Sequence, residues 1–234
     1  MRLSKRIYAL AQQVNKGESA ADIGTDHGYV PMLLMREGVS PYVIMSDISD
    51  GSLAKAVQTF KDCCIDVPET AFRTGDGLET IEPGEVDDVI IGGLGGLTIS
   101  DILDADPVKS RSFRKLILQP RKHSGNLRYY LYTHGWDITG EHLAPEGKFV
   151  CEIITAEPSS CTSRQALYPE DDIRWKYPAA LIKADRELAV RRISWKIDSL
   201  AEQIENLSNS KEDVTELAQK LKNDRQYLID LISD

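Results

Sequence analysis

The sequence predicts an α/β fold: a doubly wound, mostly parallel sheet that ends in an antiparallel hairpin and is followed by a helical hairpin. Three observations support this prediction. Short apolar runs alternate with amphipathic stretches through residues 1–133, two further apolar runs are joined by a short link, and residues 178–234 have a helical pattern throughout.

The parallel part of the sheet is predicted from five apolar runs. They are Ser19–Ile23, Tyr42–Ile48, Ala71–Arg73, Val86–Ile91 and Lys115–Gln119. Amphipathic stretches lie around these runs, as the crossover helices of a parallel sheet do. They are residues 1–16, Pro31–Glu37, Ser52–Asp62, Thr98–Leu103 and Gly125–Thr133. Ser4 is suited to cap the first helix and Gly17 to end it.

The pattern changes after Thr133. Trp136–Leu143 and Phe149–Thr155 are predicted strands, and the five-residue link between them favours an antiparallel hairpin. Residues 156–169 have the composition of a linker. Pro178 is suited to the first turn of a long helix.

The C-terminal segment has the spacing of a coiled coil. Two apolar seams are separated by a break at Ser208–Ser210, which predicts an antiparallel helical hairpin. The seams are Ile193, Ile197, Leu200, Ile204 and Leu207, then Val214, Leu217, Leu221, Leu228 and Leu231. The predicted domains are residues 1–157, a linker with a short helix at 158–177, and the coiled-coil hairpin at 178–234.

Charge and composition narrow the classes of function. The net charge of −9 excludes a general basic coat for nucleic acid, although a local basic patch is compatible with it. No apolar run reaches the roughly 18 residues that a membrane-spanning helix needs. The four cysteines form no CxxC pair. We therefore expect reduced thiols in a cytoplasmic protein, without a metal site.

The signals for a cofactor lie where the predicted strands end, which is where open α/β sheets bind ligands. Asp47 ends the second strand and is suited to accept hydrogen bonds from ribose hydroxyls. Asp76 follows the third strand between two glycines, where its carboxylate can accept from an adenine amino group. These two residues indicate adenosine, which both NAD and S-adenosylmethionine carry.

The turn after the first strand distinguishes these cofactors. Gly24 permits a tight turn and Gly28 a close approach to the next helix, but Asp26 lies where a dinucleotide places its pyrophosphate. A carboxylate there repels phosphate, whereas Asp22 and Asp26 attract an ammonium or sulfonium group. The turn therefore favours S-adenosylmethionine.

Four segments resemble the bacterial tRNA (adenine-22-N1)-methyltransferase family: Asp22–Pro31 (DIGTDHGYVP), Gly92–Gly96 (GGLGG), Leu118–Pro120 and Gly135–Phe149. The resemblance spans essentially the whole chain. It implies a class I, Rossmann-like methyltransferase fold with a C-terminal coiled coil, S-adenosylmethionine as cofactor and tRNA as substrate. The cofactor-binding residues it implies are Asp22, Gly24, Asp26, His27, Gly28, Asp47, Ile48, Gly75, Asp76, Gly77, Gly92, Gly93 and Leu94. Arg121 stands where the family usually has Asn.

Methyl transfer to adenine N1 depends mainly on positioning, because N1 already carries a lone pair. Asp26 and His27 are the candidate catalytic residues, as acceptors of the N6 proton or as groups that orient N6. The loop Gly92–Gly96 stands where amino-methylating enzymes carry an Asn/Asp-Pro-Pro-aromatic motif. Its lack of large side chains leaves room for a flipped-out base.

Binding of tRNA requires local basic surface, and two stretches supply it. Residues 111–128 contain five Arg or Lys residues before Arg128 and no acid, and residues 183–196 add a second basic cluster. Tyr29 is a candidate for stacking on a base. The predicted tRNA contacts are Tyr29, Gly95, Gly96, Gln119, Pro120, Arg121, Lys122, Arg128, Lys183, Arg186, Arg191 and Arg192.

Three alternatives remain open. The chain is compatible with a methyltransferase for a small molecule or protein, and with a non-catalytic cofactor-binding module whose helical tail binds a partner. An NAD oxidoreductase is the third, and Asp26 disfavours it. Salt-sensitive tRNA binding and a cofactor titration separate the first two from the main hypothesis. We expect no membrane contact, and a monomer is favoured over an oligomer.

Overall fold

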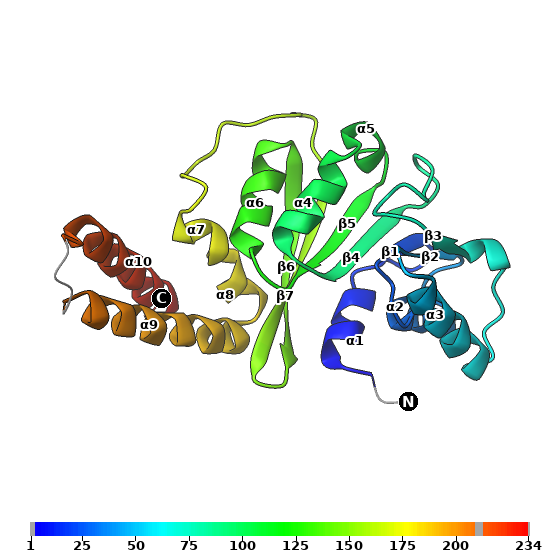
Figure 1. The fold of residues 1–234 in the computed structure, drawn as a ribbon, viewed down its shortest axis with the longest axis horizontal. Helices are drawn as coiled ribbons and strands as arrows, with labels where there is room; N and C mark the ends of the chain where they lie inside the picture. The colour runs from blue at the N-terminus through cyan, green and yellow to red at the C-terminus, as the bar shows by residue number, and fades with distance from the viewer. Residues whose placement is uncertain (1–2, 209–212, 234) are drawn as a thin grey trace.

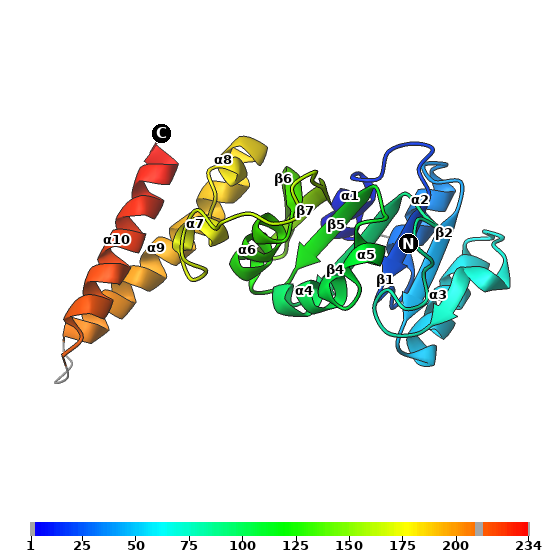
Figure 2. The ribbon, with the colours of Figure 1, turned by 90° about the horizontal axis from the view of Figure 1, so that it is seen from above.

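The computed structural model describes residues 3–208 and 213–233, which form one seven-stranded mixed sheet with helices on both faces and a helical tail (Figures 1 and 2). The strand order is β3-β2-β1-β4-β5-β7-β6, and β1 to β5 are parallel. The strands are β1 (Ala20–Ile23), β2 (Val43–Asp47), β3 (Phe72–Thr74), β4 (Asp88–Leu94), β5 (Lys115–Pro120), β6 (Trp136–Glu146) and β7 (Phe149–Pro158). The predicted doubly wound sheet with a terminal antiparallel hairpin is confirmed.

The central strands are buried on both faces, as β-branched and apolar runs in a parallel sheet should be. Alternate side chains of β4 show this: Ile90 packs among residues of α1 and α2, whereas Val89 and Ile91 pack among residues of α4 and α6. The helices of the first face are α1 (Lys5–Ala11), α2 (Tyr29–Arg36) and α3 (Asp50–Asp62). The opposite face carries α4 (Gly96–Asp104), α5 (Pro107–Ser110) and α6 (Ser124–Thr133).

The first helix is capped as predicted but is shorter than predicted. The Ser4 hydroxyl accepts a hydrogen bond from the Ile7 amide, which fixes the N-terminus of α1. The helix ends at Ala11, well before Gly17. Gly17 has a φ of +95° and its amide donates to the Val39 carbonyl, so it belongs to the turn that leads into β1.

The hairpin is longer and tighter than predicted. Glu146 pairs with Phe149, so Gly147 and Lys148 alone form the turn, and Gly147 has the positive φ that such a turn needs. Leu118 of β5 pairs with Ile154 of β7, which places Phe149 three residues beyond the end of β5. The hairpin tip therefore projects about 10 Å past the carboxyl end of β5, at roughly 3.3 Å per residue.

The tail begins with two short helices, and the prediction of a long helix from Pro178 is wrong. The structure has α7 (Ile173–Lys176), α8 (Ala180–Ala184), α9 (Arg186–Ser208) and α10 (Thr215–Ser233). Asp185 interrupts the helix because its backbone is extended, and its carboxylate instead caps α9 by accepting from the Leu188 amide.

The two long helices pack antiparallel, since Arg186 at the start of α9 donates to the Ile232 carbonyl near the end of α10. Ile193, Ile197, Leu200 and Leu228 of the predicted seams are buried. Leu217 is 49% exposed and lies outside the packed seam. Asn209 and Ser210 of the predicted break lie outside the described residues. Within residues 3–208 and 213–233, no helix has both the length and the apolar character needed to cross a membrane.

Candidate active site

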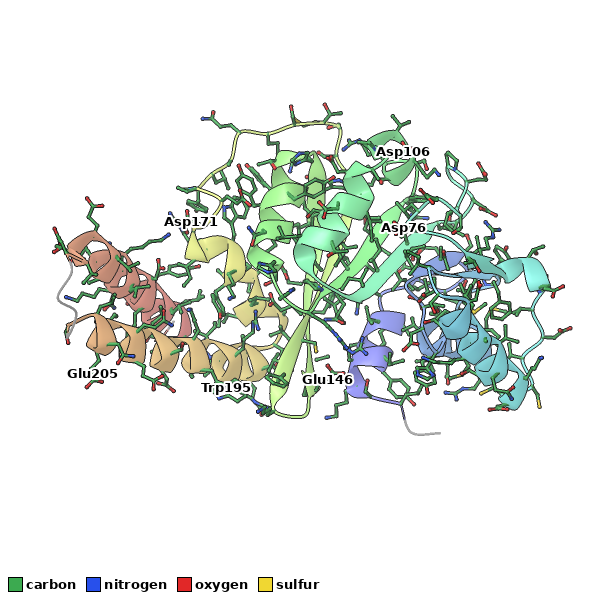
Figure 3. All side chains as sticks on the ribbon, viewed as in Figure 1. Asp76, Asp106, Glu146, Asp171, Trp195 and Glu205 are labelled. Atoms are coloured by element: carbon green, nitrogen blue, oxygen red, sulfur yellow. The ribbon has the colours of Figure 1, made fainter. Side chains whose placement is uncertain are left out.

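A cavity of about 600 Å³ lies at the carboxyl ends of β1 to β4. It is close to the point where the strand order reverses between β1 and β4, the usual ligand site of an open α/β sheet. Seven of the predicted cofactor residues line it: Gly24, Asp47, Ile48, Gly75, Asp76, Gly77 and Leu94. Figure 3 shows Asp76 and Asp106 on the same side of the sheet, and both contribute to the wall of the cavity.

The turn after β1 is held by hydrogen bonds to two aspartates. Asp22 is buried, accepts from the Thr25 hydroxyl at 2.7 Å, and has a pKa raised to about 7 by burial. Asp47 accepts from the amide of Asp26 at 3.2 Å and from that of Ser49 at 2.8 Å. Asp47 therefore fixes the loops that follow both β1 and β2.

Asp26 and His27, the predicted catalytic residues, lie on this turn with accessible side chains, beside the cavity rather than in its wall. Asp26 has a φ of +43°, a left-handed conformation that Asp tolerates better than most residues. Its carboxylate accepts from Lys55 Nζ at 2.9 Å, and this bond holds the pKa of Asp26 below its usual value. The His27 ring stacks on Tyr29 at 5.1 Å between centroids.

The contact of Lys55 with Asp26 could not be predicted from sequence. Lys55 comes from α3, and no local pattern distinguishes it from the other charged residues of that amphipathic helix. The Lys55 contact fixes the position of the Asp26 carboxylate at the edge of the turn.

Two of the predicted contact glycines are explained by packing. A Cβ on Gly28 would lie 2.9 Å from the Ala56 Cβ, so this glycine permits α2 to start against α3. Gly96 is buried, and a Cβ there would overlap the His123 carbonyl; its amide donates to the Lys122 carbonyl at 2.8 Å. Gly28 thus positions the turn after β1, and Gly96 positions the glycine loop after β4.

The glycine loop after β4 is a bulge supported by Gln119. The register between β4 and β5 shifts between Gly92 and Leu94, and Gly93 has a φ of +83°. Gln119 Oε1 accepts from the Gly93 amide and from Arg6 Nη1, each at 3.2 Å. Arg6 also donates to Glu146 at 2.9 Å, so α1, β4, β5 and the hairpin meet here. Arg6 could not be predicted from sequence, because it resembles any other basic residue of the N-terminal segment.

A second cavity, of about 920 Å³, lies between the carboxyl end of β5, the hairpin tip and α9. We call it the basic cleft. The two cavities come close together at a backbone hydrogen bond of 2.7 Å from the Arg121 amide to the Leu94 carbonyl, because Leu94 lines the first cavity and Arg121 the second. Six of the predicted tRNA contacts line the cleft: Gln119, Pro120, Arg121, Lys122, Arg191 and Arg192.

These six residues differ in whether their side chains are exposed to a ligand in the cleft. Arg121 and Lys122 are exposed, and within the described residues neither forms an ion pair. Gln119 and Pro120 are buried, so they shape the wall rather than present polar groups. Lys183 and Arg186 are exposed but lie away from the cleft, and Gly95 is covered in part by the Lys122 side chain.

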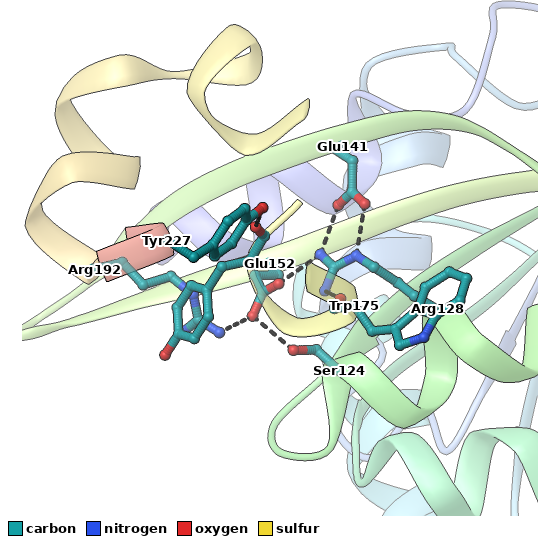
Figure 4. Close-up of polar contacts among 8 residues, drawn as sticks. Ser124, Arg128, Glu141, Glu152, Trp175, Arg192 and Tyr227 are labelled. Atoms are coloured by element: carbon teal, nitrogen blue, oxygen red, sulfur yellow. Dashed lines mark hydrogen bonds and ion pairs between the residues drawn. The ribbon is translucent and has the colours of Figure 1, made fainter. Parts of the chain in front are cut away.

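The prediction that Arg128 contacts tRNA is wrong, because its side chain is only 2% exposed. Figure 4 shows the carboxylates and the carbonyl that surround it. Arg128 forms two hydrogen bonds with Glu141, at 2.7 and 2.8 Å, and one with Glu152 at 2.5 Å. Burial disfavours its charge, but the two carboxylates outweigh burial and raise the pKa of Arg128. Arg192 of α9 also pairs with Glu152, so this cluster joins the sheet to the tail.

The described residues contain no group of three or more His, Cys, Asp or Glu side chains arranged to hold a metal ion.

A protein-family model described as "Methyltransferase domain" matches residues 3–154, which include every strand of the sheet except the end of β7. The chain belongs to this family. A curated relative, the tRNA (adenine(22)-N(1))-methyltransferase of Bacillus subtilis, is 33% identical over 157 residues, spanning 67% of this chain and 66% of the relative. The family resemblance predicted from the sequence is confirmed.

Two solved structures extend the likeness of this methyltransferase to the tail. The B. subtilis m1A22 tRNA methyltransferase has a TM-score of 0.80 and 28% identity, covering 99% of each chain. Streptococcus pneumoniae Sp1610, in complex with S-adenosyl-L-methionine, has a TM-score of 0.80 and 23% identity, covering 99% of this chain and 100% of that one. The second likeness shows the shared fold.

Proposed function

We propose that this methyltransferase transfers a methyl group from S-adenosylmethionine to N1 of an adenine in tRNA, at position 22. The observation that carries the proposal is the proximity of the two cavities at Leu94 and Arg121. A cofactor cavity that opens beside a basic cleft suits a small cationic cofactor and a large anionic substrate. The relatives name the same reaction. We further propose that the enzyme acts as a monomer in the cytoplasm, with a core and a separate tail domain.

The cofactor cavity fits S-adenosylmethionine by charge and by shape. Five carboxylates line it against one lysine: Asp47, Asp76, Glu79, Asp101 and Asp106, with Lys109. This excess of negative charge suits a cofactor with an ammonium and a sulfonium and opposes a pyrophosphate. Ile48, which is 71% exposed, offers an apolar surface for an adenine ring beside the Asp47 carboxylate. When bound, the cofactor supplies an electrophilic methyl group.

The remaining task of the chain is to hold an unpaired adenine and to stabilise the charge that develops on it. Methylation of N1 makes the adenine ring cationic until the N6 proton is lost. A fixed carboxylate beside the ring favours that charge. Asp26 is the candidate, because Lys55 holds its carboxylate in position and the Gly93 bulge leaves space for the base.

Asp26→Asn tests this role. Asn tolerates the left-handed backbone of Asp26 as Asp does, so the fold should be kept while the charge is lost. We expect kcat to fall about 10²- to 10³-fold, the usual cost of removing one electrostatic group, with unchanged affinity for tRNA. Asp62→Asn, an exposed aspartate at the end of α3, is the matched control. A kcat within threefold of the wild type would remove Asp26 from the mechanism.

The target position is tested with two tRNA transcripts that differ only at nucleotide 22. We expect methyl incorporation into the transcript with adenine there and none into the transcript with guanine. Equal incorporation into both would contradict the proposed position. Incorporation into neither, with the cofactor bound, would favour a small-molecule or protein substrate.

A further inference from the structure

Two exposed aromatic side chains meet in the basic cleft. Phe149 at the hairpin tip is 58% exposed and Trp195 of α9 is 50% exposed. Their rings lie 6.4 Å apart in an edge-to-face arrangement, and both line the cleft. Figure 3 shows Trp195 on the side of α9 next to the hairpin. At least half of each of these two residues is therefore accessible to a ligand in the cleft.

The structure holds this pair in place from both sides. Arg191 of α9 donates to the carbonyls of Gly147 at 3.0 Å and Lys148 at 2.7 Å, which ties the hairpin turn to the helix. The Arg191 guanidinium lies 5.9 Å from the Trp195 ring, and Lys148 Nζ lies 5.2 Å from the Phe149 ring. Each aromatic ring is therefore paired with a cation.

The charge around the pair favours an anionic ligand. The cleft also contains Arg121, Lys122 and Lys196, which form no ion pair within residues 3–208 and 213–233. Burial and the nearby positive charges of Lys196 and Arg192 lower the pKa of Lys176, which shows that these cations lie close enough to repel one another.

Most acids of the cleft already have partners. Glu146 pairs with Arg6, Glu152 with Arg128 and Arg192, Asp171 with Lys220, and Asp172 with Arg174. Asp224 and Glu170 also line the cleft, and Glu170 accepts a hydrogen bond from Asn126 Nδ2 at 2.9 Å.

We propose that Phe149 and Trp195 form a stacking platform for an unpaired nucleotide of the RNA other than the methylated adenine. The proposal rests on the proposed function and adds a second contact to it. The platform stands about 10 Å beyond the end of β5, a distance of about three stacked nucleotides at roughly 3.4 Å each. A ring stacks on any base, and Lys148 and Arg121 lie nearby to contact phosphates.

The test compares the wild-type chain with Trp195→Ala and Phe149→Ala in binding to unmodified tRNA at fixed salt. We expect each variant to raise Kd about 5- to 150-fold, the usual effect of losing one stacked base. Trp195→Tyr keeps a ring and should stay within about threefold. Leu217→Ala, an equally exposed apolar residue of α10, is the matched control and should not change Kd. Cofactor affinity and melting temperature should be unchanged in all four variants.

Two further readouts separate stacking from charge. Trp136 and Trp175 are buried, so fluorescence quenching by tRNA reports mainly on Trp195 and should disappear in Trp195→Ala. Lys148→Ala should lower the salt slope of binding by about one, whereas the aromatic variants should leave the slope unchanged.

The outcomes distinguish this proposal from the proposed function. Wild-type methylation of tRNA together with unchanged Kd in both aromatic variants overturns the platform and keeps the function. Quenching and loss of binding without methylation support the platform and overturn the function. A self-association that Trp195→Ala abolishes would assign the pair to a second copy of the chain and overturn the platform.

Discussion

Removing Arg128 should destabilise the protein without acting as the loss of a tRNA contact. In Arg128→Met the apolar side chain fills a similar volume, but Glu141 loses both of its hydrogen bonds and remains 5% exposed. Breaking a buried ion pair in this way costs about 3–5 kcal/mol. For a chain of this size, each kcal/mol lowers the melting temperature by about 2–4 °C, so we expect a fall of about 6–20 °C.

The assay is denaturant unfolding followed by far-ultraviolet circular dichroism. Arg174→Met is the matched control, because its partner Asp172 forms a more exposed pair whose loss should cost about 0–1 kcal/mol. Arg128→Met/Glu141→Leu removes the orphaned carboxylate, and we expect it to recover a large part of the lost stability. That recovery would show that the cost comes from the unpaired glutamate.

A different result would refute this reasoning. If Arg128→Met unfolds within 1 kcal/mol of the wild type, the buried cluster does not hold the sheet and tail together. If it keeps full stability but loses tRNA affinity with a smaller salt slope, Arg128 reaches phosphate after all.

Two further predictions concern the turn after β1 and the β4 bulge. Because the pKa of Asp22 is raised to about 7, the folded state binds more protons than the unfolded state between about pH 4 and pH 7, and stability falls as pH rises through that range. Asp22→Asn should remove this loss, on the order of 4 kcal/mol by pH 8, and unfolding at several pH values measures it; a pH-independent difference from wild type would contradict it. Gln119→Leu leaves the Gly93 amide and Arg6 without their acceptor, so kcat/KM should fall about 5- to 30-fold. Gln119→Glu keeps that acceptor and should retain most activity, and equal kinetics in both variants would argue against a positioning role.

The strands could be predicted from sequence to within a few residues because they are apolar runs that end at Asp, Gly or Pro. The length of the hairpin could not, since Ala144, Pro145 and Glu146 look like loop residues until the pairing of β6 with β7 includes them. The start of the long helix at Arg186 also escaped prediction. Pro178 supplied a plausible start, and the interruption at Asp185 depends on its local capping bond.

Some residues of the candidate site could likewise be predicted from sequence, and others could not. Asp47 and Asp76 could be placed at the cofactor cavity because strand ends converge at one sheet edge, and the family resemblance placed Leu94 there. Arg128 was misassigned because its charge resembles that of Arg121, and its partners Glu141 and Glu152 come from distant strands. The stacking pair of Phe149 and Trp195 requires the tail to fold back on the hairpin, which no local pattern reveals.

The measurement that tests the central claim most directly identifies the methylated nucleoside. The purified chain is incubated with labelled S-adenosylmethionine and unmodified tRNA, and the RNA is then digested and separated into nucleosides. We predict label in 1-methyladenosine alone. Label in N6-methyladenosine or in another nucleoside would contradict transfer to N1 of adenine, and Arg121 would then be the first residue to replace by Asn.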